Sequence, residues 1–346
     1  MLLGEMGDKV KAGLLKELLS KGVNMKVFAE HICRAYDKHI GDIPVDILSP
    51  DCCKGVLAAA DHEAPQGHRL AHGAMRHLEQ HCSIIGHMGR RGLLGENQTF
   101  IEMGAGKAGL SCTLKAALRG NMRLLVVERG GCRYKADKNF RGEESSGNFL
   151  RLRMDIAHLN LAALDFVVQT PLPPPLSDDC TSEKSARGDI VTIGKHLCGG
   201  ATDLALRCVI KTLPETAQRL QGIAIATCCH HRCDYLSYVN MDFIKNELSG
   251  GEGVGQNQDG GWGIELVSLI SSWACCCFAG NRRGGAGDSP QATSGGSKDD
   301  MEIGGGLSDD EKEKLGRKCK RLLDWGRVLW LREVGLSCVC TTGHIV

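Results

Sequence analysis

Five short apolar runs, separated by stretches of helical character, constrain the fold of this 346-residue chain more than any other feature. Runs of this length are typical of buried strands, and helical connections between them favour parallel pairing. We therefore predict an α/β fold, a doubly wound and mostly parallel sheet with helices on both faces. The predicted strands cover residues 100–103, 124–128, 152–155, 190–193 and 223–227.

Helical spacing dominates the sequence before the first run. Phe28, Ile32 and Tyr36 recur at intervals of four residues, and Leu14 to Leu19 show a similar pattern. Pro44 interrupts it because proline lacks a helical donor. We assign residues 1–77 to a helical N-terminal extension and residues 78–346 to the domain that contains the sheet. Further helices are predicted over 67–91 and 308–334, and a final edge strand over 338–346.

Three segments have compositions that bury little apolar surface. They are the proline-rich residues 171–188 and the glycine-rich residues 249–261 and 280–311. Such segments do not offset the entropy of ordering, so we predict loop insertions within one domain.

Composition limits the classes of protein and the compartment. The net charge of +1 shows no global basic excess, so a nucleic-acid partner would need a local basic patch. The 18 cysteines raise the question of a disulfide scaffold, but the chain is long and the first residues carry no secretory signal pattern. We expect an intracellular protein of the cytoplasm or nucleus, without a membrane span. The oligomeric state is unspecified.

A glycine-rich turn follows the first predicted strand and precedes a helix. Its glycines permit a tight turn and close approach of a ligand, as in dinucleotide sites. Acidic residues at three strand ends favour S-adenosylmethionine over NAD, since one can face an ammonium and two can accept hydrogen bonds from ribose and adenine. A turn made only for packing is the remaining alternative. The candidate cofactor-binding residues are Glu102, Gly104, Gly106, Lys107, Glu128 and Asp155.

Lys195 and His196 stand where the fourth predicted strand gives way to a glycine turn. Open α/β sheets present reactive groups to ligands from this position. We predict a chemical site there. The alternatives are a solvated lysine and a hydrogen-bonded imidazole.

The fifth predicted strand ends in the run Cys228-Cys229-His230-His231-Arg232-Cys233. We interpret this run as an active-site wall in which His230 and Arg232 lie beside the reacting group. A zinc site formed by Cys228, Cys229 and Cys233 is the alternative, although neighbours this close do not easily surround one tetrahedral ion. Four histidines at helical spacing, namely His68, His72, His77 and His81, are interpreted as exposed or hydrogen-bonded rather than metal-binding.

Four motifs together resemble the methyltransferase domain of the eukaryotic tRNA acceptor-stem ribose 2′-O-methyltransferases. They are the runs at residues 102–107, 194–199, 228–233 and 316–327. The resemblance implies a Rossmann-like class I methyltransferase that uses S-adenosylmethionine to methylate the 2′-hydroxyl of a cytidine or adenosine in the tRNA acceptor stem. Members of that family usually begin with small Cys/His zinc fingers, and no such spacing precedes Leu14.

Methylation of a ribose hydroxyl requires the removal of a proton from a weak acid. We assign that proton to Lys195, with a pKa lowered by burial or by Arg232, and name His196 and His230 as the other candidates.

The predicted C-terminal helix supplies a basic patch for tRNA. Lys314, Arg317, Lys318 and Arg321 recur on one face, with Trp325 continuing it and an apolar stripe of Leu315, Cys319 and Leu322 beside it. An ordinary solvated face is equally open.

Two other functions are consistent with these motifs. The acceptor of the methyl group could be another RNA or a protein. The chain could also be a module that holds zinc or S-adenosylmethionine without catalysis.

Overall fold

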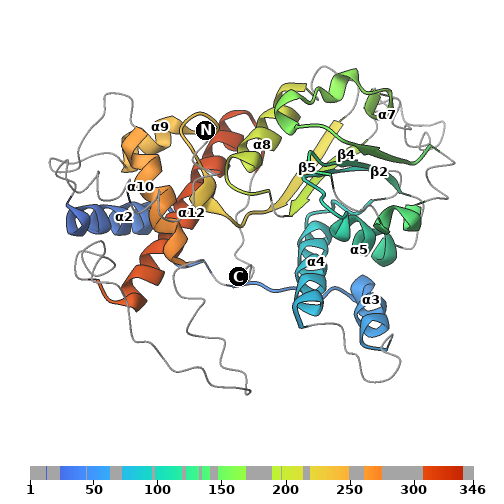
Figure 1. Ribbon diagram of the computed structural model, residues 1–346, viewed down its shortest axis with the longest axis horizontal. Helices are drawn as coiled ribbons and strands as arrows, with labels where there is room; N and C mark the ends of the chain where they lie inside the picture. The colour runs from blue at the N-terminus through green and yellow to red at the C-terminus, as the bar shows by residue number, and fades with distance from the viewer. Residues whose placement is uncertain are drawn as a thin grey trace, which may run out of the picture.

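The computed structural model describes residue 13 and residues 24–43, 45–62, 72–95, 98–118, 122–131, 135–140, 147–168, 189–195, 197–212, 219–248, 261–274 and 307–337. Figure 1 shows two parts of the molecule. One part is the sheet with the helices that cover it, and the other is a cluster of helices. Helix α8 (Gly200–Thr212) lies between them.

The sheet has five described strands, all parallel, in the order β3-β2-β1-β4-β5. The chain order changes direction between the neighbours β1 and β4. Ligands of open α/β sheets bind outside the carboxyl ends of the strands at such a point. The strands are β1 (Thr99–Met103), β2 (Arg123–Val127), β3 (Phe149–Leu152), β4 (Asp189–Lys195) and β5 (Arg219–Ala226).

Alternate side chains of the strands enter two separate cores. Phe100, Leu124 and Val191 pack beneath three helices, whereas Ile101 and Leu125 pack on the opposite face. The sheet is therefore covered on both faces, which accounts for strands that are apolar throughout. The helices of the first face are α3 (Asp51–His62), α4 (His72–Arg90) and α5 (Gly109–Leu118), and those of the second are α7 (Asp165–Val168) and α8.

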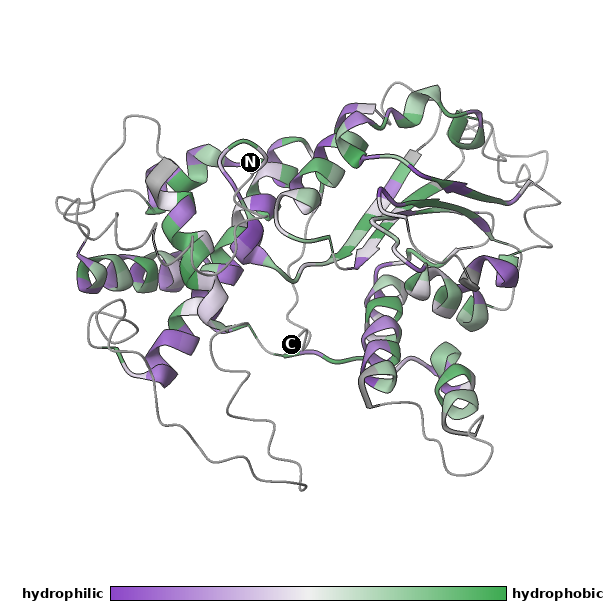
Figure 2. Ribbon diagram, in the orientation of Figure 1, coloured by the Kyte–Doolittle hydropathy of each residue, from purple (hydrophilic) through white to green (hydrophobic). Residues whose placement is uncertain are grey.

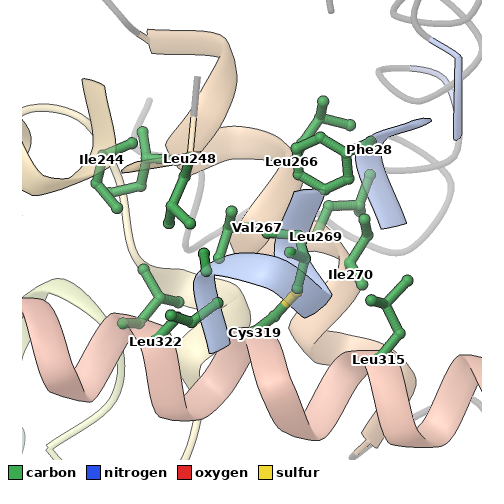
Figure 3. Close-up of a cluster of buried hydrophobic side chains, with 14 of the residues drawn as sticks. Phe28, Ile244, Leu248, Leu266, Val267, Leu269, Ile270, Leu315, Cys319 and Leu322 are labelled. Carbon is green, nitrogen blue, oxygen red and sulfur yellow. The ribbon is translucent and has the colours of Figure 1, made fainter. Parts of the chain in front are cut away.

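A third core holds the helical cluster together. Figure 3 shows Phe28 of one helix, Ile270 of a second and Cys319 of a third converging on it. Phe28 and Cys319 are fully buried, and burial of a side chain the size of Phe28 contributes about 1.5–3 kcal/mol. The helices are α2 (Met25–His39), α9 (Met241–Phe243), α10 (Gly261–Ser271) and α12 (Asp309–Glu333).

Helix α12 begins at a strong capping signal. The Ser308 side chain accepts a hydrogen bond from the backbone N–H of Glu311, and the Glu311 carboxylate accepts one from the backbone N–H of Ser308. The first turn is hydrophilic in Figure 2, whereas Leu315, Cys319 and Leu322 are buried. The predicted helix and its apolar stripe are confirmed.

The predicted sheet is confirmed, with a change in its third strand and in two predicted loops. The third strand is Phe149–Leu152 and ends before the predicted residues 153–155. The segment predicted as a loop at 280–311 includes residues 307–311, which belong to the capped start of α12. Gly261, predicted to end another loop, is the first residue of α10.

Several predictions fall outside the described residues. These are the loops at 171–188, 249–260 and 280–306, the final strand at 338–346, and the leucines at 14–19. The predicted boundary after residue 77 lies within helix α4. Among the described helices, none combines the length and apolarity needed to cross a membrane.

Candidate active site

The turn after β1 has the backbone conformation that its glycines permit. Gly104 and Gly106 have φ angles of +63° and +50°, in the left-handed region that favours glycine. Ala108 also adopts a positive φ of 57° just before α5 begins. A Cβ at Gly106 would meet no atom within 4 Å, so the backbone there is open to a ligand.

Glu102, at the carboxyl end of β1, caps the N-terminus of α5. Its carboxylate accepts hydrogen bonds from the backbone N–H and the hydroxyl of Ser111. Only 2% of Glu102 is exposed, and burial raises the pKa of its carboxyl to about 7 against these hydrogen bonds. Glu102 therefore fixes the helix that follows the glycine turn.

Glu128 connects the ends of β1 and β2. One oxygen accepts a hydrogen bond of 2.8 Å from the N–H of Gly106, and the other accepts one of 2.7 Å from Gly130. Each carboxylate oxygen keeps a second lone pair. Glu128 can thus hold the glycine turn and still accept a ligand hydroxyl.

Arg151 of β3 supports the same turn. It forms a two-point contact with Asp137, at 2.7 and 2.6 Å, and donates a third hydrogen bond to the carbonyl of Gly106. The sequence pattern did not predict a role for Arg151 or Asp137. An arginine inside a strand gives no sign from sequence alone that its side chain reaches the turn after β1, two strands away in the sheet.

Asp155 lies beyond the end of β3 rather than at it. Its carboxylate accepts a hydrogen bond from the N–H of Ala157 and begins the 3₁₀ turn Ile156–His158. Arg129 contacts the other oxygen at 3.1 Å. The short aspartate side chain favours this local turn over continuation of the strand, which explains the early end of β3.

Lys195 is the last residue of β4 and lies on the same face of the sheet as Glu102. Glu102 pairs with Ile193, and Lys195 follows Ile193 by two residues, so the three side chains share a face. The side chain is buried, with 4% exposed. Its Nζ lies 3.2 Å from the carbonyl oxygen of His77 and 3.3 Å from that ring's Nδ1. Burial lowers the pKa of Lys195 to about 8, although the charges of Glu102 and Cys228 oppose that shift.

Of the two causes predicted for that lowered pKa, burial is the one that acts. His77 comes from α4, so a helix of the N-terminal half completes the surroundings of Lys195. The interpretation of His77 and His81 as hydrogen-bonded residues is also confirmed, since His81 Nδ1 lies 2.9 Å from the hydroxyl of Thr113. His68 and the side chain of His72 lie outside the described residues.

Three cysteine thiols meet at the ends of β4 and β5. The Sγ atom of Cys228 is 3.7 Å from that of Cys198 and 3.6 Å from that of Cys229. Hydrogen bonds from its two neighbours lower the pKa of Cys198, and the charge of Arg232 contributes in the same direction. The group differs from the predicted zinc ligands by one residue, since Cys198 takes the place of Cys233.

Cys233 belongs instead to a buried network of charges. Its Sγ accepts a hydrogen bond from Arg327, which is 4% exposed and also contacts Asp203 at 2.6 Å and Asp324 at 2.9 Å. Asp203 is fully buried in α8, so the network joins α12 to the helix that follows Lys195. Sequence reasoning missed it because its members are separated by up to 124 residues.

His230 forms the other end of this network. Its Nε2 lies 2.8 Å from Asp324, and its Nδ1 lies 3.1 Å from the carbonyl oxygen of Cys228. Burial favours the neutral acid, but the combined effect of His230, Arg327 and Thr227 holds the pKa of Asp324 below its usual range. These two contacts hold the His230 ring between α12 and the turn after β5.

Arg232 is half-buried beside Cys198, and its backbone packs on Gly199. A Cβ at Gly199 would clash with the carbonyl group of Arg232, and Gly199 has a φ of +55°. Only glycine therefore lets the two turns meet. His196 lies outside the described residues.

The basic stripe of α12 divides into two parts. Lys314 and Arg317 are exposed, and Arg317 pairs with Glu313. Lys318 and Arg321 are half-buried and lie over the ring of Tyr36 in α2, and Arg321 also donates to its hydroxyl. Trp325 lies against Arg332.

Comparison with known proteins assigns the family. Residues 79–341, about three quarters of the chain, match the family Methyltransferase TRM13. The chain belongs to the TRM13 methyltransferase family. The resemblance inferred from the sequence is thereby confirmed.

Relatives in the TRM13 family are longer than this chain. A mouse protein named "tRNA:m(4)X modification enzyme TRM13 homolog" is 30% identical over 329 residues, which cover 80% of this chain and 63% of the mouse protein. A human protein of the same name is 31% identical, over 76% of this chain and 60% of the human protein. A relative from Yarrowia lipolytica is 27% identical, over 88% and 62%. No solved structure shows a significant match.

The site of this TRM13-family chain fits S-adenosylmethionine. The open backbone at Gly106 and the spare lone pairs of Glu128 would hold a nucleoside with an amino-acid tail. Lys107 is exposed on the same turn. Among the described residues, the candidates Glu102, Glu128 and Lys195 and the cysteine run that begins at Cys228 lie at or just beyond the carboxyl ends of β1, β2, β4 and β5.

Proposed function

We propose that this chain transfers a methyl group from S-adenosylmethionine to the ribose 2′-hydroxyl of a cytidine or adenosine in the tRNA acceptor stem. Its relatives are named as tRNA modification enzymes, which supports tRNA as the substrate. The observation that carries the chemistry is Lys195, a buried amine at the carboxyl end of β4. We place the reaction in the cytoplasm or nucleus, where thiols stay reduced.

The glycine turn and its acidic neighbours would bind the cofactor, which supplies a methyl group on a sulfonium centre. Glu128, which already holds the N–H of Gly106, would accept hydrogen bonds from the ribose hydroxyls of the cofactor beside the open backbone of Gly106. Asp155, which Arg129 contacts through one oxygen, would accept a hydrogen bond from the adenine amino group. Glu102 keeps α5 and the turn in place through Ser111.

Lys195 takes the proton of the attacking 2′-hydroxyl at its Nζ. A base works best when its pKa lies near the working pH, and burial lowers the pKa of Lys195 to about 8. A tenth of such amines are neutral at about one pH unit below that value. His77 orients the amine through its carbonyl oxygen, so α4 contributes to the geometry of proton removal.

Lys314 and Arg317 are the residues of α12 that would contact tRNA phosphates most directly, because both are exposed. Lys318 and Arg321 extend the same stripe toward Tyr36. We therefore propose this face of α12 as the tRNA-binding surface.

Two alternatives share part of this structure. The three close thiols favour a zinc-holding module without catalysis. The same site could also methylate another RNA or a protein.

A labelling experiment distinguishes these alternatives. The purified chain is incubated with labelled S-adenosylmethionine in three separate reactions, which contain total tRNA, ribosomal RNA or cell protein. We expect label in tRNA alone. Label in ribosomal RNA or protein alone, or in no acceptor, would contradict the proposal.

A further inference from the structure

The thiols of Cys198, Cys228 and Cys229 form a cluster that the methyl-transfer proposal does not use. Their Sγ atoms all lie within 4.8 Å of one another. Within the described part of the chain, this is the group of three or more histidine, cysteine and acidic side chains close enough to share a metal ion.

The separations within the cluster match thiolates on one tetrahedral ion. Zinc binds sulfur at about 2.3 Å, so two thiolates on one zinc lie about 3.8 Å apart. The Cys198–Cys228 and Cys228–Cys229 Sγ separations are 3.7 and 3.6 Å. The Sγ atoms of Cys198 and Cys229 lie within 4.8 Å of each other.

Backbone geometry allows adjacent cysteines to converge. Successive side chains of an extended strand point to opposite faces, but Cys229 has a ψ of 64° and immediately precedes the 3₁₀ turn His230–Arg232. The chain turns at Cys229, and the thiols of Cys228 and Cys229 end on the same side. The objection raised from sequence spacing therefore does not apply to this pair.

The turn that carries Cys198 is also fixed. The hydroxyl of Thr202 donates a 2.7 Å hydrogen bond to the carbonyl oxygen of Leu197, and Gly199 packs on the backbone of Arg232. The guanidinium of Arg232 also contacts the thiol of Cys198. The cluster is thus held by contacts between the two turns before any ion binds.

Ligand chemistry selects the metal. Thiolates are soft ligands that favour zinc, whereas magnesium and calcium prefer oxygen. All three cysteines are half-buried, so a fourth position is accessible to water. Cys233 and His230 are engaged by Arg327 and Asp324 and do not supply it.

We propose that Cys198, Cys228 and Cys229 bind one zinc ion, with water as the fourth ligand, and that this ion joins the turn after β4 to the turn after β5. The site would set the position of the segment that follows Lys195 relative to Arg232. Zinc binding stands apart from methyl transfer and can be present or absent whichever acceptor is used.

The test begins with metal analysis of the whole purified chain, expressed with added zinc. We expect one equivalent of zinc that is lost in Cys198→Ser, Cys228→Ser and Cys229→Ser. Cys112→Ser, which changes a half-buried cysteine elsewhere, and Cys233→Ser should both retain it. Retention of the full zinc content in the triple serine variant would overturn the proposal.

Cobalt substitution provides a readout that does not depend on the variants folding. Cobalt added to the metal-free wild-type chain should give intense tetrahedral d–d bands and a thiolate-to-metal charge-transfer band at one equivalent. Cys112→Ser should give the same spectrum. Weak octahedral bands without charge transfer, or a disulfide between two of the three cysteines in the freshly purified protein, would also overturn it.

Discussion

Lys195 is the residue on which the proposed chemistry depends. A lysine with 4% exposure must lose most of its hydration, and no carboxylate hydrogen-bonds its Nζ among the described residues. The charged form is therefore disfavoured. Lys195 ends β4, which is the parallel neighbour of β1, so it lies at the same edge of the sheet as the glycine turn after β1.

The pH dependence of methyl transfer should follow the neutral form of Lys195. With the pKa lowered to about 8, the rate at saturating cofactor and tRNA should rise about tenfold per pH unit below pH 8 and level off above it. Initial rates measured between pH 6 and pH 10 check this expectation.

Substitution separates the proton-accepting role of Lys195 from its charge. Lys195→Ala and Lys195→Arg should both lower the rate by about 10²–10⁴-fold, since arginine stays protonated. Cofactor affinity should change little, and Lys211→Ala serves as the control. Full activity of Lys195→Arg would exclude Lys195 as the base.

Glu128 should affect cofactor binding rather than chemistry. Glu128→Gln replaces a charged acceptor, and hydrogen bonds to charged groups contribute about 1.5–3 kcal/mol. We expect the Kd for S-adenosylmethionine, measured by calorimetry, to rise at least about tenfold. Asp165→Asn, an exposed carboxylate of α7, should leave the Kd unchanged, and an unchanged Kd in Glu128→Gln would remove Glu128 from the binding site.

At the scale of elements, α12 is connected to the site by the contacts of Arg327 with Asp203 and Asp324. Arg327 and Asp203 are buried and Asp324 is half-buried, so removal of one partner leaves the others uncompensated. Such a change costs about 3–5 kcal/mol. The network therefore stabilises the packing of α12 against α8 and the turn at His230.

Arg327→Met should lower the free energy of unfolding by about 3–5 kcal/mol. Arg332→Met, which changes an exposed arginine of the same helix, should cost less than about 1 kcal/mol. Urea denaturation of both variants measures the difference. Equal stabilities would show that the network contributes nothing to the fold.

The elements were largely predictable from sequence because apolar runs and capping signals act locally. Ser308 and Glu311 specify the start of α12 within four residues. The end of β3 was not predictable, because the run at 152–155 continues in apolar and polar alternation while Asp155 caps a turn instead. Local hydrogen bonding by a short side chain prevailed over the strand pattern.

The position of the candidate site could be predicted from the sequence, but the side chains that contact its residues could not. Strand ends placed Lys195, Glu128 and Cys228 together, because parallel strands end at one edge. His77, Arg151 and Asp324 were missed, since each reaches the site through tertiary packing that no short spacing encodes.

At the scale of the whole molecule, α2 packs with α12 although α3 and α4, the next helices in the chain, cover the sheet. Tyr36 of α2 lies beneath Lys318 and Arg321. The N-terminal half thus supports both the proposed RNA-binding face and, through His77, the surroundings of Lys195.

Charge reversal on α12 should weaken tRNA binding in a salt-dependent way. In Lys314→Glu/Arg317→Glu, the slope of log affinity against log salt should fall by about one unit for each phosphate that the helix no longer neutralises. Lys54→Glu/Lys138→Glu, at exposed positions near the sheet, should keep the wild-type slope. An unchanged slope in the α12 variant would place the tRNA elsewhere.

The position of the transferred methyl group on tRNA decides whether the chain methylates a ribose of the acceptor stem. Total tRNA methylated by the wild-type chain can be digested to nucleosides and to mapped fragments for mass spectrometry. We predict a 2′-O-methylcytidine or 2′-O-methyladenosine in the acceptor stem, absent after reaction with Lys195→Ala. A methyl group on a base, or on a ribose outside the acceptor stem, would contradict the account.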